Sequence, residues 1–192
     1  MSDIWELLGQ LTSGDDDLAE GAVSKIILSA GEALPALQEL LHSSSIDNRW
    51  WSVRVLSEIH DAAVPSLLCQ ALQDSSLEVR QCAALGLCRQ PTPDAVSLLI
   101  PLLRSRDQVL SGLAVEALIA IGPLAVHPLM HVLRQGSKGE RRLAARALAM
   151  IGDACSIPAL CAALEDASPM VVYWAERGLE RMGVGLLLYR PE

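Results

Sequence analysis

The feature that most constrains this chain is a set of small and apolar columns that recur every 30 or 31 residues. Internal similarity at such a period is the signature of a repeat architecture. Successive members are separated by 31, 31, 30 and 31 residues. The columns are Leu37, Leu68, Leu99, Leu129, Leu160; Leu41, Leu72, Leu103, Leu133, Leu164; Ser52, Ala83, Ala114, Ala144, Ala175; and Leu56, Leu87, Leu118, Leu148, Leu179. Leu11, Ala22 and Ile26 continue three columns one step back, so we expect about six units.

Each unit has the pattern of two helices joined by a short turn. In the unit that begins at residue 64, Pro65 lies where a helix tolerates proline, in the first turn. Residues 74–76, Asp-Ser-Ser, break that helix and supply an N-cap for the next one. The second helix then repeats apolar residues at i, i+3, i+4, i+7 and i+8 from Val79 to Leu87. Three units end in a glycine suited to a helix C-cap, namely Gly122, Gly152 and Gly183.

A two-helix unit of this length cannot bury its apolar face alone, so neighbouring units must stack. The small-residue column allows adjacent helices to approach closely, and the leucine columns fill the space between layers. Hydrophobic residues make up 51% of the 192-residue chain and charged residues 20%, which is enough to form a core. We therefore predict an all-α solenoid with a right-handed superhelix. Residues 1–183 would form a single repeat domain, followed by an apolar tail, 184–192.

Charge and composition exclude several classes of protein. The formal net charge is −8, whereas general nucleic-acid binders are basic. No apolar run approaches the ~20 residues of a bilayer-spanning helix, so we expect no membrane partner. No basic region precedes an apolar stretch at the N-terminus, so no secretory signal is expected. The five cysteines include no Cys-x-x-Cys pair, which argues against a disulfide framework and favours the cytoplasm.

Residues 157–166 with Val171 and the segment 175–183 resemble a HEAT repeat, and more narrowly the short HEAT-like repeats of phycobilisome lyases. The run from Val64 through Asp74 to Leu87 shows the fuller motif. The resemblance spans roughly residues 3–183 and implies a fold rather than a function. Arg49, Arg80 and Arg141 occupy the family's arginine position, whereas Ser111 and Val172 replace it in two units. Any Asp–Arg ladder between repeats must therefore be interrupted.

The resemblance also implies that the second helix of each unit lines a concave groove. The repeat register then predicts an apolar strip rimmed by arginine, with Trp50 and Tyr173 in the groove and Trp51 and Trp174 in the core. The predicted partner-binding residues are Trp50, Val53, Arg54, Leu85, Cys88, Val115, Glu116, Ile119, Arg142, Arg146, Tyr173 and Arg177. Trp beside Arg on an apolar floor is typical of interface hot spots. The alternative is a register displaced by one helical step, which would place these residues in the core.

The sequence shows no catalytic, cofactor-binding or metal-binding constellation. His127 and His131 have a metal-binding i, i+4 spacing, but no third ligand accompanies them. The acidic residues 15–17 fit a helix N-terminus favoured by the helix dipole, rather than a metal site. Cys88 falls in a groove column, yet nothing beside it in sequence would lower its pKa.

Three functions remain open at this point. The first is a non-enzymatic interaction module or scaffold that binds a helix or extended peptide of a partner protein in its groove. The second, from the resemblance, is a chaperone or lyase-like protein for a bilin-type chromophore, whose propionates would pair with arginines of the groove. The third is an assembly protein, in which the tail 184–192 enters a neighbouring molecule rather than capping its own last repeat. The sequence names no specific partner.

Overall fold

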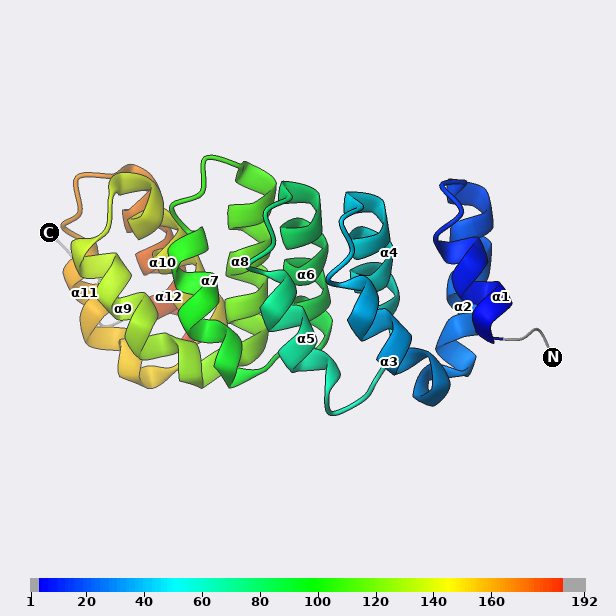
Figure 1. The fold of residues 1–192 in the computed structure, drawn as a ribbon. Coiled ribbons are helices and arrows are strands. Elements are labelled where there is room, and N and C mark those ends of the chain that lie inside the picture. The colour runs from blue at the N-terminus through cyan, green and yellow to red at the C-terminus, as the bar shows by residue number, and fades with distance from the viewer. Residues whose placement is uncertain (1–3, 185–192) are drawn as a thin grey trace, which may run out of the picture. The chain divides into compact units, whose positions relative to one another are not determined.

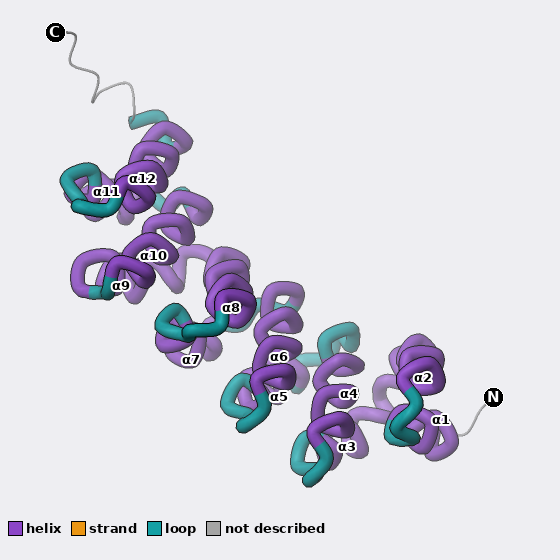
Figure 2. The backbone as a smooth tube through the Cα atoms, turned by 90° about the horizontal axis from the view of Figure 1, so that it is seen from above, coloured by secondary structure: helices purple, strands orange, loops and turns teal. Residues whose placement is uncertain are grey.

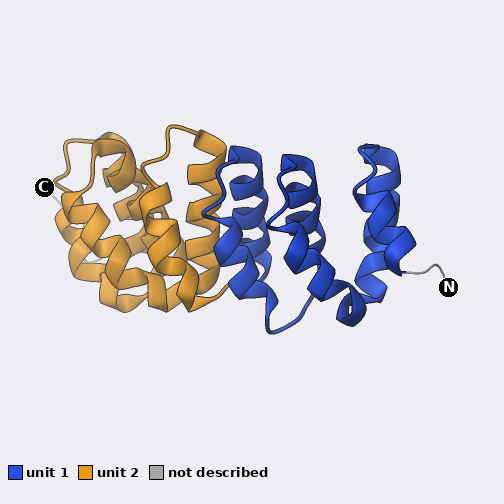
Figure 3. Ribbon diagram, viewed as in Figure 1, with its two compact units in different colours: residues 1–90 blue, residues 91–192 orange. Residues whose placement is uncertain are grey.

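The computed structural model describes residues 4–184, and these residues form α-helices and three short 3-10 helices with no β-strand (Figure 1). The chain divides into two compact units, Met1–Gln90 and Pro91–Glu192 (Figure 3). Unit 1 contains α1 (Ile4–Leu11), α2 (Asp16–Leu28), α3 (Ala30–Leu40), α4 (Ile46–Leu56), α5 (Val64–Ala71) and α6 (Leu77–Arg89). Unit 2 contains η1 (Pro93–Ala95), α7 (Val96–Leu102), α8 (Gln108–Ile121), η2 (Gly122–Ala125), α9 (Val126–Gln135), α10 (Lys138–Ile151), η3 (Ala154–Ser156), α11 (Ile157–Ala163) and α12 (Pro169–Arg181).

Each unit consists of three helical pairs, so the prediction of about six two-helix repeats is confirmed. The second helices of successive repeats contact one another, α2 with α4 and α4 with α6 in unit 1, and α8 with α10 and α10 with α12 in unit 2. The first helices lie in a separate layer, which Figure 2 shows within each unit. Whether residues 1–183 act as one domain with a right-handed superhelix stays a prediction.

The second helices begin where the sequence supplies a polar N-cap. Asp15, Ser45, Ser76, Asp107 and Ser137 each accept a hydrogen bond from a backbone N–H in the first turn of the helix that follows. These bonds satisfy donors that would otherwise lack an intrahelical partner. In the last repeat a proline occupies the first helical position instead, and the preceding serine makes no side-chain cap. The side-chain caps thus fix the start of these five second helices in the same repeat register.

The predicted columns form the core of both units. Every member of the Leu37 column and of the Leu56 column is 0% exposed, as is every member of the small-residue column from Ser52 to Ala175. Ser52 keeps its hydroxyl buried by donating a hydrogen bond of 2.6 Å to the Leu37 carbonyl oxygen. In the Leu41 column the first four members are buried and Leu164 is half-buried. Burial of one leucine contributes about 1.5–3 kcal/mol, so the repeated columns dominate folding.

Close packing between helices explains why residue 178 is glycine, which the repeat pattern alone does not explain. A Cβ atom at Gly178 of α12 would lie 2.9 Å from the Ala149 Cα atom and 3.0 Å from Leu160 Cδ1. The backbone of α10 therefore leaves no room for a larger residue there. The glycines predicted to end three units have positive φ, at +75° for Gly122, +70° for Gly152 and +77° for Gly183. A side chain at these positions would strain the backbone.

One expectation about apolar runs needs correction. Residues Gln108–Gln135 are long and apolar enough, by length and composition, to cross a membrane. In the structure this stretch is not one rod. Gly122 and Pro123 divide it into α8, η2 and α9, which belong to two successive repeats of unit 2. Its apolar character reflects buried faces of core helices, such as Leu118 and Leu129, both 0% exposed. The predicted tail 184–192 lies outside the described residues, except for Val184.

Candidate functional site

The predicted groove residues occupy four repeat positions on the second helices, and one of these positions is buried. Val53 and Val115 are 0% exposed, so their predicted place on a groove wall is wrong. Each second helix packs against its own first helix and also against second helices beside it, so its buried arc is wider than a single amphipathic stripe. The other predicted residues reach the surface. Trp50, Arg54, Cys88, Ile119 and Arg146 are half-buried, and Leu85, Glu116, Arg142, Tyr173 and Arg177 are exposed.

Most predicted groove arginines are held in ion pairs within their own unit. Arg54 pairs with Glu20 of α2 at 3.1 Å and with Glu58 at 3.0 Å. Arg146 pairs with Glu116 of α8, and Arg177 lies 3.5 Å from Glu180. Among the predicted groove arginines of the described chain, Arg142 alone has no ion pair. Most of the arginines predicted to rim the apolar strip are therefore already paired with glutamates of their own unit.

A hollow of about 710 Å³ opens on the surface of unit 1 beside Trp50. It is lined from α2, α4 and α6 by Asp16, Asp17, Glu20, Ile46, Asp47, Trp50, Trp51 and Glu78. The two indole rings meet edge to face, with centroids 4.8 Å apart and planes at 86°. Trp51 is only 7% exposed, as predicted for a core residue, and it supports the half-buried Trp50, whereas Trp174, also predicted in the core, is half-buried. Five carboxylates surround this aromatic wall, and no lysine or arginine lines it.

Three of these carboxylates share one repeat position. Asp17, Asp47 and Glu78 are each the second residue of a second helix, at steps of 30 and 31, the steps of the leucine columns. A carboxylate in the first helical turn is stabilised by the helix dipole. The helices of unit 2 carry Val109, Gly139 and Met170 at this position. The acidic column is thus confined to unit 1, and sequence reasoning missed it because the acids of α2 were assigned to helix capping alone.

The carboxylates of the hollow differ in how far their charge is compensated. Glu20 is paired with Arg54. Glu78 accepts a 2.6 Å hydrogen bond from the Ser76 hydroxyl, which lowers the pKa of Glu78. Asp16, Asp17 and Asp47 are exposed, and in the described chain their side chains have no ion pair or hydrogen bond. These three carboxylates are the acceptors that a ligand in the hollow would meet.

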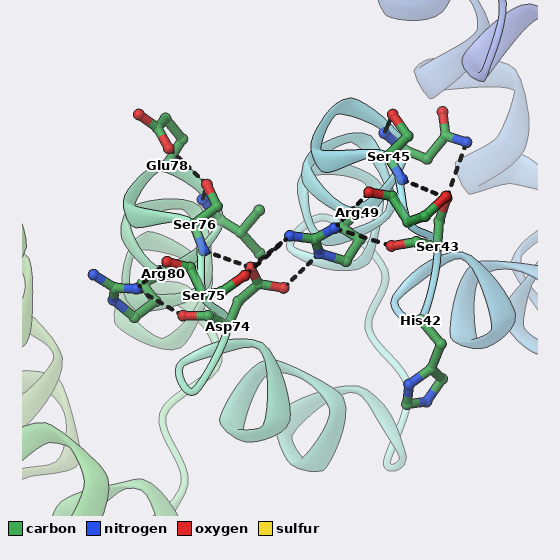
Figure 4. Close-up of polar contacts among 12 residues, drawn as sticks. His42, Ser43, Ser45, Arg49, Asp74, Ser75, Ser76, Glu78 and Arg80 are labelled. Atoms are coloured by element: carbon green, nitrogen blue, oxygen red, sulfur yellow. Dashed lines mark hydrogen bonds and ion pairs between the residues drawn. The ribbon is translucent and has the colours of Figure 1, made fainter.

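A bidentate ion pair holds the helix ends that present the acidic column (Figure 4). From α4, Arg49 Nε and Nη2 donate to the two carboxylate oxygens of Asp74 at 2.7 and 2.9 Å. Arg49 Nη1 donates to the Ser43 carbonyl oxygen at 2.9 Å, and Asp74 accepts the backbone N–H of Ser76 at 2.7 Å. The Arg49 guanidinium lowers the pKa of Asp74. We call this arrangement the Arg49–Asp74 clamp; it ties the start of α4 to the turn before α6.

Unit 2 repeats the clamp with Arg141 and Asp166, which meet at 2.7 and 3.1 Å. The ladder is interrupted as predicted at Ser111, whose hydroxyl donates to the Gln108 carbonyl oxygen at 3.2 Å. Arg80 carries the family's arginine, yet it donates to the carbonyl oxygens of Asp74 and Ser75 at 2.7 and 2.9 Å, and Ser105 stands at the next acidic position in sequence. The clamps are therefore structural contacts between consecutive repeats inside a unit, and not free groups for a ligand.

The remaining chemical candidates show no reactive arrangement. Cys88 donates a 3.3 Å hydrogen bond to the Ala84 carbonyl oxygen, and burial raises the pKa of Cys82 to about 11. His127 and His131 are both exposed on α9. Among residues 4–184, no group of three or more His, Cys, Asp or Glu side chains is arranged to hold a metal ion.

Comparison with known proteins identifies the repeat. A HEAT-repeat family model matches residues 64–142, and the PBS lyase HEAT-like repeat model matches residues 49–74 and 140–166. A search of curated proteins finds no significant match. An archaeal HEAT-like repeat protein from Thermococcus onnurineus NA1 has a TM-score of 0.66 and 16% identity, over 100% of this chain and 84% of that one.

Two engineered proteins are similar in the same way. A designed armadillo repeat protein in complex with a (KR)4 peptide has a TM-score of 0.58 and 22% identity, over 94% of this chain and 100% of that one. Another engineered protein has a TM-score of 0.57 and 24% identity, over 96% and 98% of the two chains. At these identities the likeness shows the repeat-solenoid fold alone. Between residues 49 and 166 the chain thus matches HEAT-repeat models, including the model of the PBS lyase HEAT-like repeat.

Proposed function

We propose that this protein is a non-enzymatic interaction module, and that the exposed face of α2, α4 and α6 binds a segment of a partner protein. The observation that carries the proposal is the hollow beside Trp50, where a half-buried indole, an exposed isoleucine and unpaired carboxylates occur together. Aromatic side chains set among polar groups are typical of the centres of protein interfaces. A peptide bound to a designed armadillo repeat protein of similar fold supports a peptide segment as the ligand.

The chromophore alternative has less support from the site. A bilin would need free arginines for its propionates. Arg54, Arg146 and Arg177 already pair with glutamates, which leaves Arg142 as the single predicted groove arginine outside an ion pair in the described chain. Assembly through the tail 184–192 concerns residues outside the described part and stays a prediction.

Photo-crosslinking from defined positions tests the proposed face. A benzoylphenylalanine at position 85, an exposed position on α6, should form crosslinks to a partner in an extract of the source organism. The same group at position 66, an exposed position on α5 in the other layer, should form no crosslinks to that partner. In a pull-down without the crosslinker, a Trp50→Ala/Leu85→Ala variant should fail to capture the partner that crosslinking identified. A Leu28→Ala/Leu124→Ala control, which truncates two exposed leucines that do not line the hollow, should retain it. Equal crosslinking from both positions would refute the proposed face.

A further inference from the structure

We propose that the hollow on α2, α4 and α6 binds an extended, cationic segment of the partner protein, with Arg or Lys side chains between the acidic column and the Trp50 ring. The acidic column is Asp17, Asp47 and Glu78. This inference rests on the proposed function and specifies the chemistry of its ligand.

Charge complementarity selects among possible occupants. The lining contains five carboxylates and no basic residue, and only Glu20 has an ion pair, with Arg54. An apolar helix seated in the hollow would take the carboxylates of Asp17 and Asp47 out of water without a partner, which is costly. An anionic segment would be repelled. A cationic segment gains ion pairs at each repeat and leaves no acceptor unsatisfied.

The aromatic wall provides the second, independent contact. A guanidinium or ammonium group over an indole face is attracted by the ring's quadrupole, and tryptophan is the most favourable ring for this contact. Trp50 is held in place by its edge-to-face contact with buried Trp51. Ile46, 50% exposed at the start of α4, offers an apolar surface for the aliphatic stem of a long cationic side chain. The hollow therefore matches both the charged head and the apolar stem of Arg or Lys.

The spacing of the acidic column indicates an extended ligand. Packed helices lie about 8–10 Å apart, and the column presents one carboxylate per second helix. Three residues of an extended chain span about 10 Å. Cationic residues at i, i+3 and i+6 of a bound segment would thus meet Asp17, Asp47 and Glu78 in turn. Unit 2 has Val109, Gly139 and Met170 at the same repeat position, so the match belongs to unit 1.

The test uses the full chain and a synthetic probe. The probe is an acetylated, amidated nonapeptide with three arginines separated by Gly-Ser, and its control carries citrulline, the uncharged isostere, in place of arginine. Binding is followed by isothermal titration calorimetry and by tryptophan fluorescence. We expect the arginine peptide to bind at least tenfold more tightly than the citrulline peptide, with an affinity that falls as salt rises.

Two matched triple variants localise the effect. Asp17→Asn/Asp47→Asn/Glu78→Gln should weaken binding by tenfold or more. Glu6→Gln/Glu32→Gln/Glu39→Gln, which removes three exposed charges from α1 and α3, should change it by less than threefold. The two variants alter the net charge equally, so a non-specific effect would affect both. Trp50→Leu should also weaken binding and abolish the fluorescence change. Circular dichroism verifies that each variant is folded, and the single variant Asp47→Asn replaces the triple variant if it is not.

The inference is overturned by equal binding of the arginine and citrulline peptides, or by equal loss of binding in both triple variants. Either of these results would leave the crosslinking of α6 to a partner unaffected. Loss of that crosslinking with retained peptide binding would instead refute the proposed function. The two experiments thus fail separately.

Discussion

Breaking the Arg49–Asp74 clamp is the most informative perturbation of this fold, because the clamp joins two consecutive repeats through side chains that are only 11% and 12% exposed. The variant Asp74→Asn keeps an oxygen for the backbone N–H of Ser76. It removes the charge and turns an amide NH2 toward the guanidinium. The 2.7 Å hydrogen bond from Arg49 Nε to Oδ2 is lost, and the 2.9 Å bond from Nη2 to Oδ1 loses its charged acceptor.

The expected magnitude follows from that geometry. A hydrogen bond to a charged group contributes about 1.5–3 kcal/mol, and removal of one partner from a buried ion pair costs about 3–5 kcal/mol. The clamp lies at the edge of the core rather than deep within it, so we expect Asp74→Asn to cost about 3 kcal/mol of local stability. Arg177 and Glu180, 3.5 Å apart with side chains 57% and 58% exposed, provide a control pair worth less than about 0.5 kcal/mol.

Hydrogen exchange measured by mass spectrometry is the appropriate assay, because the stability of a repeat protein is distributed over neighbouring repeats and global unfolding need not be two-state. About 3 kcal/mol corresponds to roughly 100-fold faster exchange in peptides that cover residues 74–82. A double-mutant cycle with Arg49→Met isolates the pair energy, expected at about 1.5–3 kcal/mol. If Asp74→Asn accelerates exchange no more than Glu180→Gln does in its own helix, the clamp contributes no net stability and the reasoning fails.

Other measurements test the packing and the electrostatics of unit 2. Gly178→Ala should destabilise the protein by about 1–3 kcal/mol in thermal denaturation, because the new methyl group would meet backbone 2.9 Å away. Gly112→Ala, in a helix with open space around the site, should stabilise it by about 0.5–1 kcal/mol. Burial of Glu140 opposes its ionisation, but hydrogen bonds from Ser137 and Arg104 hold its pKa at about 2, below the 4.5 of a free glutamate. By linkage this difference corresponds to about 3 kcal/mol of stability, which is present above pH 4.5 and lost as the pH falls toward 2. The Glu140→Gln variant should be less stable than the original protein at pH 7. Its stability, measured by urea denaturation, should change less between pH 4.5 and pH 2.

The sequence was sufficient to predict the repeat fold because the same columns recur across five units. Leu37 or Leu56 alone would be an ordinary apolar residue, but each is one of five members at constant spacing, and all are buried. The groove was harder to predict, because the amphipathic pattern of one helix does not reveal the helices beside it. Val53 is buried for that reason. The acidic column had a visible signal, the steps of 30 and 31 between Asp17, Asp47 and Glu78.

What the sequence did not show is that the column surrounds Trp50. Each acid alone is explained by its helix dipole, so no single residue points to a ligand. The hollow arises only when α2, α4 and α6 pack side by side and bring their first turns to one surface. Contacts between repeats, such as the Arg49–Asp74 clamp, then fix where those first turns lie. The site is thus a property of the stacking, and the information for it is distributed over three repeats.

The residues that build the repeat differ from the residues that distinguish one unit from the other. The buried leucine and alanine columns continue through both units, and each unit has its own Arg–Asp clamp. The second position of the second helix is free of these packing demands. It carries acids in α2, α4 and α6, but valine, glycine and methionine in α8, α10 and α12. Because that position changes character while the core does not, the same helical pairs present an acidic column in unit 1 and uncharged residues at the same position in unit 2.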